Sequence, residues 1–239
     1  MAAAVVLSPH PDDAVLSLWH RLTAGEPVRV VNVFGGSPAG HEGDAWWDRL
    51  TRAPDSVARV AERHAEDREA LALAGREPEN LGLLDGQYRD SAPGLAPIVA
   101  AIDQAADADA LLLAPAALDG QRDHRLVRGA ALGLHRQGRR VALYADVPHA
   151  TLYGWPAWVT DNEPDPHLDP EAFWALQLRG TGIALTPEDA QVHALEPGTL
   201  AAKRDAVRAY RTQVPALEHE YSLLQREDVL AYEVVWPLS

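Results

Sequence analysis

Short apolar runs alternate along this chain with longer segments in which apolar residues recur every three or four positions. The short runs, flanked by turn residues, indicate buried strands, and the longer pattern indicates amphipathic helices. The expected strands are residues 5–7, 28–34, 81–84, 110–114, 141–144 and 232–236. The expected helices are residues 15–24, 56–74, 95–106, 124–134 and 199–211. This alternation predicts an α/β fold, a three-layer sandwich with helices on both faces of a mostly parallel central sheet.

A polar turn with the sequence Ser-Pro-His-Pro-Asp-Asp, residues 8–13, follows the first strand. It displays His10, Asp12 and Asp13 where the strand passes into a helix, and Rossmann-like sheets bind their ligands at such strand ends. Zinc binds imidazole nitrogen and carboxylate oxygen, and a catalytic zinc site has three protein ligands and one open position. The adjacent side chains of Asp12 and Asp13 leave the turn in different directions. One carboxylate can therefore bind a cation while its neighbour acts as a base. The alternative is that His10 and Asp12 only start and cap the helix.

A second polar turn, residues 119–124, follows the apolar run 111–115. In a parallel sheet this turn opens on the same edge as the first, so it is the best source of a third ligand. His124 is expected at the start of a helix, where the positive end of the helix dipole disfavours the imidazolium and keeps the ring available to a metal.

Together the two turns resemble those of the PIG-L / LmbE-like family of zinc-dependent N-deacetylases. Weaker similarities at residues 63–66, 84–89, 144–150 and 203–213 extend the resemblance over nearly the whole chain. The resemblance implies one deacetylase domain, residues 1–239, that removes an N-acetyl or other N-acyl group from an amino sugar or a related small metabolite.

The resemblance also implies roles for residues of the two turns. His10, Asp13 and His124 match the metal ligands, and Asp12 matches the general base that takes a proton from the metal-activated water. Asp123 either orients a neighbouring group or caps the helix. The expected ion is Zn²⁺, with Fe²⁺, Mn²⁺ and Co²⁺ as alternatives.

Two positions depart from the family pattern. Ala14 replaces a glutamate that often follows the paired carboxylates, and Gln121 replaces a histidine that helps to stabilise the tetrahedral oxyanion. Glutamine donates a neutral hydrogen bond but carries no positive charge, and one oxyanion donor is worth about 3 kcal/mol. His149, on the loop after the fifth expected strand, is a candidate to compensate or to bind substrate. Arg63 either contacts substrate or forms a solvated ion pair on its helix.

Several tryptophans either line a binding site or fill the core. Trp46 and Trp47 lie in the long loop of residues 35–54, where they can stack on a sugar ring or pack against the next helix. The segment 150–170 shows little periodicity and is the expected lid or substrate-selecting loop. The other tryptophans that could wall a pocket or fill the core are Trp155, Trp158 and Trp174.

The composition narrows the partners of the protein. Of its 239 residues 47% are hydrophobic and 23% charged, typical of a globular protein. The formal charge of −14 opposes binding to nucleic acid. The absence of cysteine excludes thiolate ligands and leaves histidine and carboxylate for a metal. The apolar N-terminal stretch is too short for a signal peptide or a membrane span, so we expect a cytoplasmic protein without a membrane partner. A homo-oligomer is compatible with the sequence.

Three functions fit these observations. The first is an N-deacetylase acting on an N-acylated amino sugar or glycosylated small molecule, as in secondary metabolism. The second is a homologue that retains the metal without catalysing hydrolysis. The third is a related metallohydrolase acting on another amide or an ester in natural-product biosynthesis. A nucleotide-binding protein is disfavoured, because the first turn lacks a glycine-rich phosphate loop.

Overall fold

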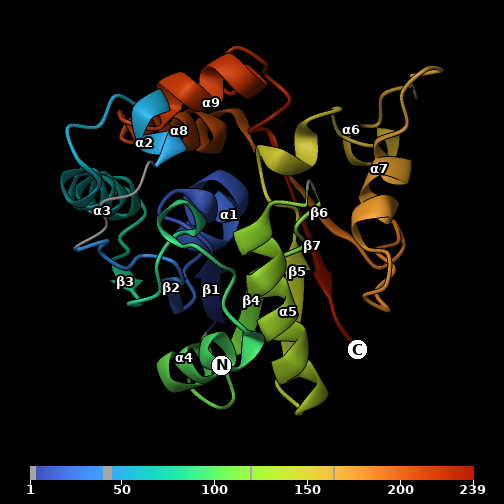
Figure 1. Cartoon of the computed structure of the whole chain (residues 1–239). Coiled ribbons are helices and arrows are strands. Elements are labelled where there is room, and N and C mark those ends of the chain that lie inside the picture. Colours follow the sequence, from blue (N-terminus) through green and yellow to red (C-terminus); the bar gives the residue numbers. More distant parts are fainter. Residues whose placement is uncertain (1–3, 40–44, 119, 164) are drawn as a thin grey trace.

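The structure, a computed structural model, describes residues 4–39, 45–118, 120–163 and 165–239 (Figure 1). Within these residues seven strands form one sheet in the order β3-β2-β1-β4-β5-β7-β6. The strands are β1 (Ala4–Ser8), β2 (Val28–Asn32), β3 (Pro78–Asn80), β4 (Leu111–Pro115), β5 (Val141–Tyr144), β6 (Gln191–Ala194) and β7 (Tyr232–Pro237). The first five pair in parallel, and β7 pairs antiparallel with both β5 and β6. The predicted α/β fold with a mostly parallel sheet is confirmed.

Helices cover both faces of the sheet (Figure 1). On one face α8 contacts both α1 and α3, and on the other α4 packs against α5. The long helices are α1 (Asp13–Thr23), α3 (Ser56–Ala72), α4 (Leu95–Ala105), α5 (Arg122–Arg136) and α8 (Pro197–Arg208). The shorter ones are α2 (Trp46–Leu50), α6 (Ala157–Thr160), α7 (Pro170–Gln177), α9 (Val214–Tyr221) and the 3₁₀ turns η1 (Gly86–Tyr88) and η2 (His149–Thr151). Among the described residues, no helix combines the length and apolar character needed to cross a membrane.

The central strands are apolar because they are covered on both faces. All five residues of β1 are buried, and β4 and β5 are buried apart from Leu111. Removing such side chains from water contributes about 25 cal/mol per Å² of apolar surface. This continuous burial is why the sequence pattern located these strands correctly.

The third strand is the clearest error of the sequence prediction. The structure places β3 at Pro78–Asn80, whereas the apolar run 81–84 lies in the loop that follows. β3 is a three-residue edge strand of polar sequence that pairs with β2 alone, so no buried face marks it in the pattern. β6, also at an edge, was not predicted either.

The sheet order brings the two polar turns together. β1 lies between β2 and β4, so the chain runs outward from β1 in one direction through β2 and β3 and returns to its other side with β4. Such a reversal of strand order leaves a crevice at the carboxyl ends of the two central strands, where open α/β sheets bind ligands. The turns that follow β1 and β4 both open into this crevice.

Candidate active site

The first turn is shaped by hydrogen bonds around Ser8. Its hydroxyl donates to the carbonyl oxygen of His10 at 2.7 Å and accepts from the backbone amide of Ala14 at 3.1 Å. Asp12 has a φ of +124°, a strained value that costs a non-glycine residue about 1–3 kcal/mol and often marks a functional site. Although Asp12 precedes α1, its side chain makes no capping hydrogen bond. The interpretation of Asp12 as a simple helix cap is therefore wrong.

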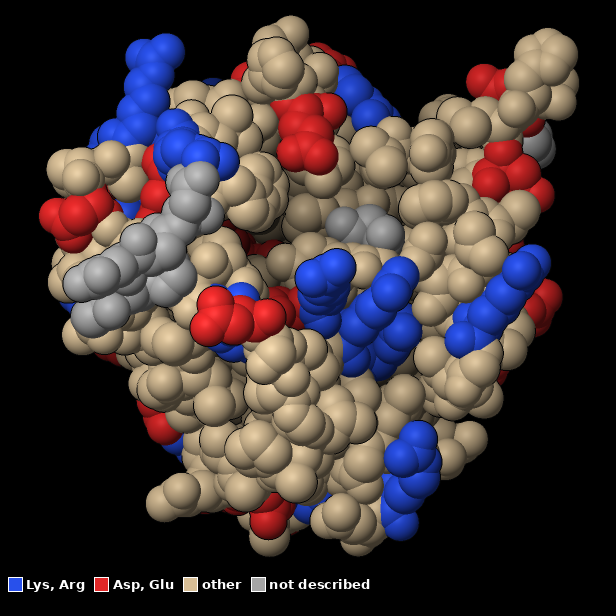
Figure 2. Space-filling model, viewed as in Figure 1, with Lys and Arg blue, Asp and Glu red and all other residues tan. Residues whose placement is uncertain are grey.

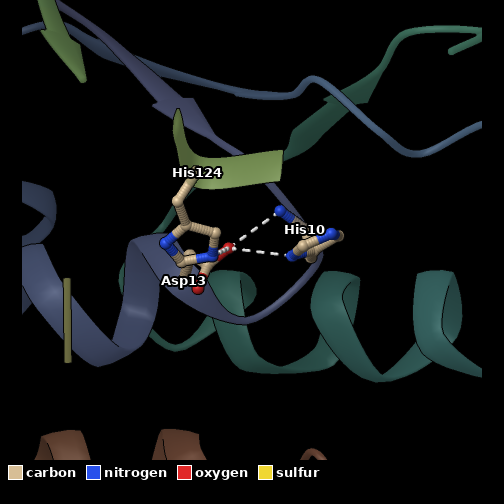
Figure 3. Close-up of side chains that lie close together, drawn as sticks. All are labelled: His10, Asp13 and His124. Carbon is tan, nitrogen blue, oxygen red and sulfur yellow. Dashed lines mark hydrogen bonds and ion pairs between the residues drawn. The ribbon is translucent and has the colours of Figure 1, made fainter. Parts of the chain in front are cut away.

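Two imidazoles, one from each turn, converge on one carboxylate oxygen of Asp13 (Figure 3). Oδ2 of Asp13 lies 3.5 Å from Nδ1 of His10 and 3.4 Å from Nε2 of His124, and all three residues are buried. Ligands at zinc bond lengths of about 2.0–2.1 Å in a tetrahedron lie about 3.4 Å apart. Nε2 of His124 is buried without a hydrogen-bond partner among the described residues. The geometry and this unsatisfied nitrogen both fit a divalent cation such as zinc.

Each imidazole is oriented by a carboxylate on its other side. Nε2 of His10 donates to Asp123 at 3.2 Å, and Nδ1 of His124 donates to Asp146 at 2.9 Å. These bonds leave Nδ1 of His10 and Nε2 of His124 facing Asp13, in the carboxylate–histidine arrangement that supports metal ligands. No role was assigned to Asp146 from the sequence, although a carboxylate two residues after β5 was a usable signal.

A second cluster, formed by His10, Asp85 and Asp123, also has ligand-like spacing. Its carboxylates already have cationic partners, because Arg89 pairs with Asp123 and Arg63 donates to Asp85 at 3.2 Å. Asp123 accepts a further bond from the backbone amide of Gly86 at 2.8 Å. This cluster therefore supports the first one and is poorly suited to a second cation.

Asp12 lies beside the cluster as an additional carboxylate. Burial and the neighbouring charge of Asp13 raise the pKa of Asp12 to about 7, against the opposing effects of Arg63 and His10. Nη2 of Arg63 lies 3.9 Å from Oδ2 of Asp12. Arg63 is only 6% exposed, so its alternative interpretation as a solvated ion pair is wrong. A carboxyl group whose pKa is near neutrality is suited to exchange protons during a reaction.

The cluster of His10, Asp13 and His124, called the ligand cluster below, stabilises positive charge on its imidazoles. Burial opposes the imidazolium of His10, but Asp85, Asp123 and Asp13 outweigh it and raise its pKa to about 10. The pKa of His124 is likewise raised by Asp13 and Asp146 against its burial. The pKa of Asp13 is lowered, because His124 and His10 outweigh the effect of burial. A metal ion would take the place of the protons on these imidazoles.

The cluster opens into a cavity of about 650 Å³. Figure 2 shows this face hollowed, with acidic and basic side chains around the hollow. Seven of the predicted site residues line the cavity: His10, Asp12, Asp13, Arg63, Gln121, Asp123 and His149. His124 is fully buried and contacts Asp13, so the structure brings every predicted site residue to one place. Asp119, from the second turn, lies outside the described residues.

Gln121 and His149 occupy different positions in this cavity. The side-chain carbonyl oxygen of Gln121 accepts hydrogen bonds from the backbone amides of Asp123 and His124, at 2.6 and 2.9 Å, and so caps α5. The ring of His149 stands edge-on to His124 with centroids 5.0 Å apart, and its Nδ1 lies 2.9 Å from the hydroxyl of Tyr221.

The tryptophans divide between the core and the cavity. Trp155 and Trp174 are buried and pack edge-on, which confirms their core role. None of the described residues of the 150–170 segment lines the cavity. The structure therefore gives no support to the expected role of this segment as a lid or substrate-selecting loop. Trp46 and Trp47 both line the cavity; Trp47 is partly buried against the core, whereas Trp46 is 58% exposed.

An open α/β sheet that joins two histidines, one aspartate and an additional carboxylate at its switch point defines a candidate metallohydrolase site. The chain belongs to the PIG-L family: the family profile, described as GlcNAc-PI de-N-acetylase, matches residues 5–134. A stretch of 166 residues, 61% of the chain, is 33% identical to 2′-N-acetylparomamine deacetylase of Streptomyces fradiae. This stretch spans 57% of that relative's length.

Solved structures share the whole fold. A deacetylase of teicoplanin biosynthesis, in complex with bog, superposes with a TM-score of 0.71 at 21% identity, covering 99% of this chain and 97% of that one. The zinc-inhibited form of a teicoplanin deacetylase gives a TM-score of 0.64 at 22% identity, with coverage of 99% and 97%. At these identities the similarity establishes the fold.

Proposed function

We propose that this protein is a metal-dependent N-deacetylase that removes an acetyl or other acyl group from the nitrogen of an amino sugar or a glycosylated small metabolite. The observation that carries the proposal is the convergence of His10 and His124 on Asp13. Asp12 lies beside them as a carboxylate outside this proposed ligand set. The family and the deacetylase activities of its relatives support this proposal. We treat residues 1–239 as one catalytic domain.

The ligand set is His10, Asp13 and His124, and the preferred ion is zinc, with Fe²⁺, Mn²⁺ or Co²⁺ as alternatives. A divalent ion at this place would polarise a water molecule and the carbonyl group of the amide. Its presence is supported by the unsatisfied Nε2 of His124, and the set of two imidazoles and one carboxylate is one that zinc accepts.

Asp12 is the proposed general base. Its carboxylate accepts a proton as water adds to the carbonyl carbon, and it returns that proton to the nitrogen as the carbon–nitrogen bond breaks. The products are a carboxylate, acetate for an acetyl group, and a free amine. Arg63, beside Asp12, orients that carboxylate and contacts the substrate.

Gln121 and His149 are the candidate hydrogen-bond donors to the oxyanion. Gln121 was predicted from the sequence to have this role, and that assignment stays a prediction. In the structure its side-chain carbonyl oxygen caps α5. His149 is the proposed second donor, since it lines the cavity next to His124 and is oriented by Tyr221. Asp123 acts through His10 by fixing the orientation of the imidazole.

The expected substrate is a small molecule without strong negative charge. Carboxylates outnumber guanidinium groups among the described residues of the cavity, and the chain carries a formal charge of −14. The resulting negative electrostatic potential repels phosphorylated or polyanionic substrates and attracts amino sugars that carry protonated amines. An amide or ester of another natural product remains the alternative within the same chemistry.

A second candidate is a protein that binds the metal without hydrolysing an amide. The presence of Gln121 in place of a histidine favours it, because a glutamine amide carries no positive charge with which to stabilise the oxyanion.

The test compares zinc-loaded wild-type protein with the Asp12→Asn variant. Acetate release is measured on a panel of N-acetylated amino sugars that includes 2′-N-acetylparomamine, and zinc content is measured by elemental analysis. We expect Asp12→Asn to keep its zinc and to lose at least about 100-fold in turnover. Asp205→Asn, which changes an exposed carboxylate on α8, is the matched control.

Retained turnover in Asp12→Asn would remove Asp12 from the role of base. Bound zinc in the wild-type protein together with no release of acyl groups from any substrate would favour the second candidate.

A further inference from the structure

Trp46, the first residue of α2, lies exposed on the wall of the catalytic cavity. It is 58% exposed although it lines the same cavity as His10 and Asp12. Its neighbour Trp47 packs edge-on against it, with ring centroids 5.3 Å apart. The indole nitrogen of Trp47 donates to the buried side chain of Gln213 at 2.6 Å. The neighbour that supports Trp46 is thus anchored in the core.

The short helix that presents Trp46 is held by contacts to three parts of the chain. Besides the bond from Trp47, both carboxylate oxygens of Asp48 lie 2.9 Å from the hydroxyl of Tyr88. Arg59 donates to the carbonyl oxygen of Thr51 at 2.7 Å. Five residues form too few internal hydrogen bonds to be a stable helix alone, so these contacts fix its place. A large aromatic side chain is therefore held at the cavity wall by buried neighbours.

We infer that Trp46 is a stacking platform for a second ring of the substrate, so that the substrate is an N-acetylated amino sugar of at least two linked rings. The inference rests on the proposed function, which places the acylated ring at Asp12 and the ligand cluster. The apolar face of a sugar ring matches the flat face of an indole. A cavity of about 650 Å³ has room for a drug-sized ligand, more than a single acylated sugar.

Leu50 provides a matched comparison on the same helix. Its exposed fraction of 55% is close to that of Trp46, but it does not line the cavity. A general apolar surface on α2 would involve both residues, whereas a substrate platform in the cavity involves Trp46 and not Leu50.

The experiment measures binding rather than turnover. N-acetylglucosamine is the one-ring probe and N,N′-diacetylchitobiose the two-ring probe, and their affinities are measured by calorimetry on zinc-loaded protein with the Asp12→Asn substitution to prevent hydrolysis. Trp46→Ala, Trp46→Phe and Leu50→Ala are each added to this background. Circular dichroism verifies that each variant is folded.

We expect the two-ring probe to bind at least tenfold more tightly than the one-ring probe. Trp46→Ala should lower the ratio of the two affinities about tenfold, Trp46→Phe should restore part of it, and Leu50→Ala should leave it unchanged. The inference is overturned if the two-ring probe has no advantage, or if Trp46→Ala does not alter the ratio. Acetate release by the wild-type protein is scored separately, so failure of the proposed function is distinguishable from failure of the platform.

Discussion

His124, at the start of α5, is bonded through Nδ1 to Asp146 and directs Nε2 toward Asp13. Asp146 is fully buried and also accepts the backbone amide of Leu118 at 3.2 Å, so both of its oxygens have defined donors. At the scale of a single residue, this carboxylate determines which nitrogen of His124 can bind a metal.

The first prediction concerns Asp146→Asn. The amide can keep one oxygen for Leu118, but its NH₂ group would then face Nδ1 of His124 and oppose the required tautomer. We expect zinc affinity to fall about 10- to 100-fold, measured by competition with a chromophoric chelator. Asp103→Asn, at an exposed carboxylate on α4, is the control. An unchanged affinity would show that Asp146 does not orient His124.

The second prediction separates the roles of Gln121 and His149. In Gln121→Ser the new hydroxyl can cap α5, so we expect stability to be kept and turnover to change by less than about tenfold. In His149→Phe a donor at the cavity wall is lost, and we expect kcat to fall about 100-fold with little change in zinc content. Steady-state kinetics on the same substrate measures both. The reverse order of effects would assign the oxyanion to Gln121.

Among the secondary-structure elements, α1 is interrupted at Leu18, whose φ and ψ of −140° and 34° are not helical. The amides of the next two residues, Trp19 and His20, donate instead to the carboxylate of Glu233 on β7, at 2.7 and 2.9 Å. Lys203 on α8 completes this buried group with a bond of 2.7 Å to Glu233. The kinked helix, the sheet and α8 are thereby joined at one ion pair.

The third prediction concerns this ion pair. Lys203→Met leaves the charge of Glu233 buried without its cation, so we expect the free energy of unfolding to fall by about 3–5 kcal/mol. Adding Glu233→Gln should recover part of the loss, since the amide oxygen still accepts a backbone hydrogen bond and no isolated charge remains. Urea unfolding of both variants measures the difference. A double variant no more stable than the single one would contradict this account.

For the molecule as a whole, the core and the ligand cluster are separate. The core lies along the central strands and the helices on them, whereas the proposed metal ligands lie at the carboxyl edge of the sheet. Binding of the proposed metal at this edge would stabilise the native state by mass action without being required for the fold.

The fourth prediction follows from this separation. Removal of the metal should leave the far-ultraviolet circular dichroism unchanged. Zinc at about 1,000 times its dissociation constant should add about 4 kcal/mol of stability, which corresponds to a rise in Tm of about 8–16 °C. His124→Ala should abolish the response to zinc. Loss of secondary structure in the metal-free protein would contradict the prediction.

The sequence predicted the central strands because burial on both faces leaves an uninterrupted apolar run in β1, β4 and β5. It failed at β3 and β6, since edge strands have little buried surface to leave a pattern. It also left open whether Arg63 is exposed, because the carboxylates that neutralise it, Asp12 and Asp85, belong to distant segments.

By itself the sequence determined the alternation of strands and helices, the two polar turns and the residue types able to bind a cation, because these follow from local periodicity and side-chain chemistry. Only the tertiary structure decided that His10 presents Nδ1 and His124 presents Nε2, that Asp146 orients the latter, and that Trp46 lies on the cavity wall. The physical reason is that these features depend on contacts between segments far apart in the chain, which form only when the strand order is fixed.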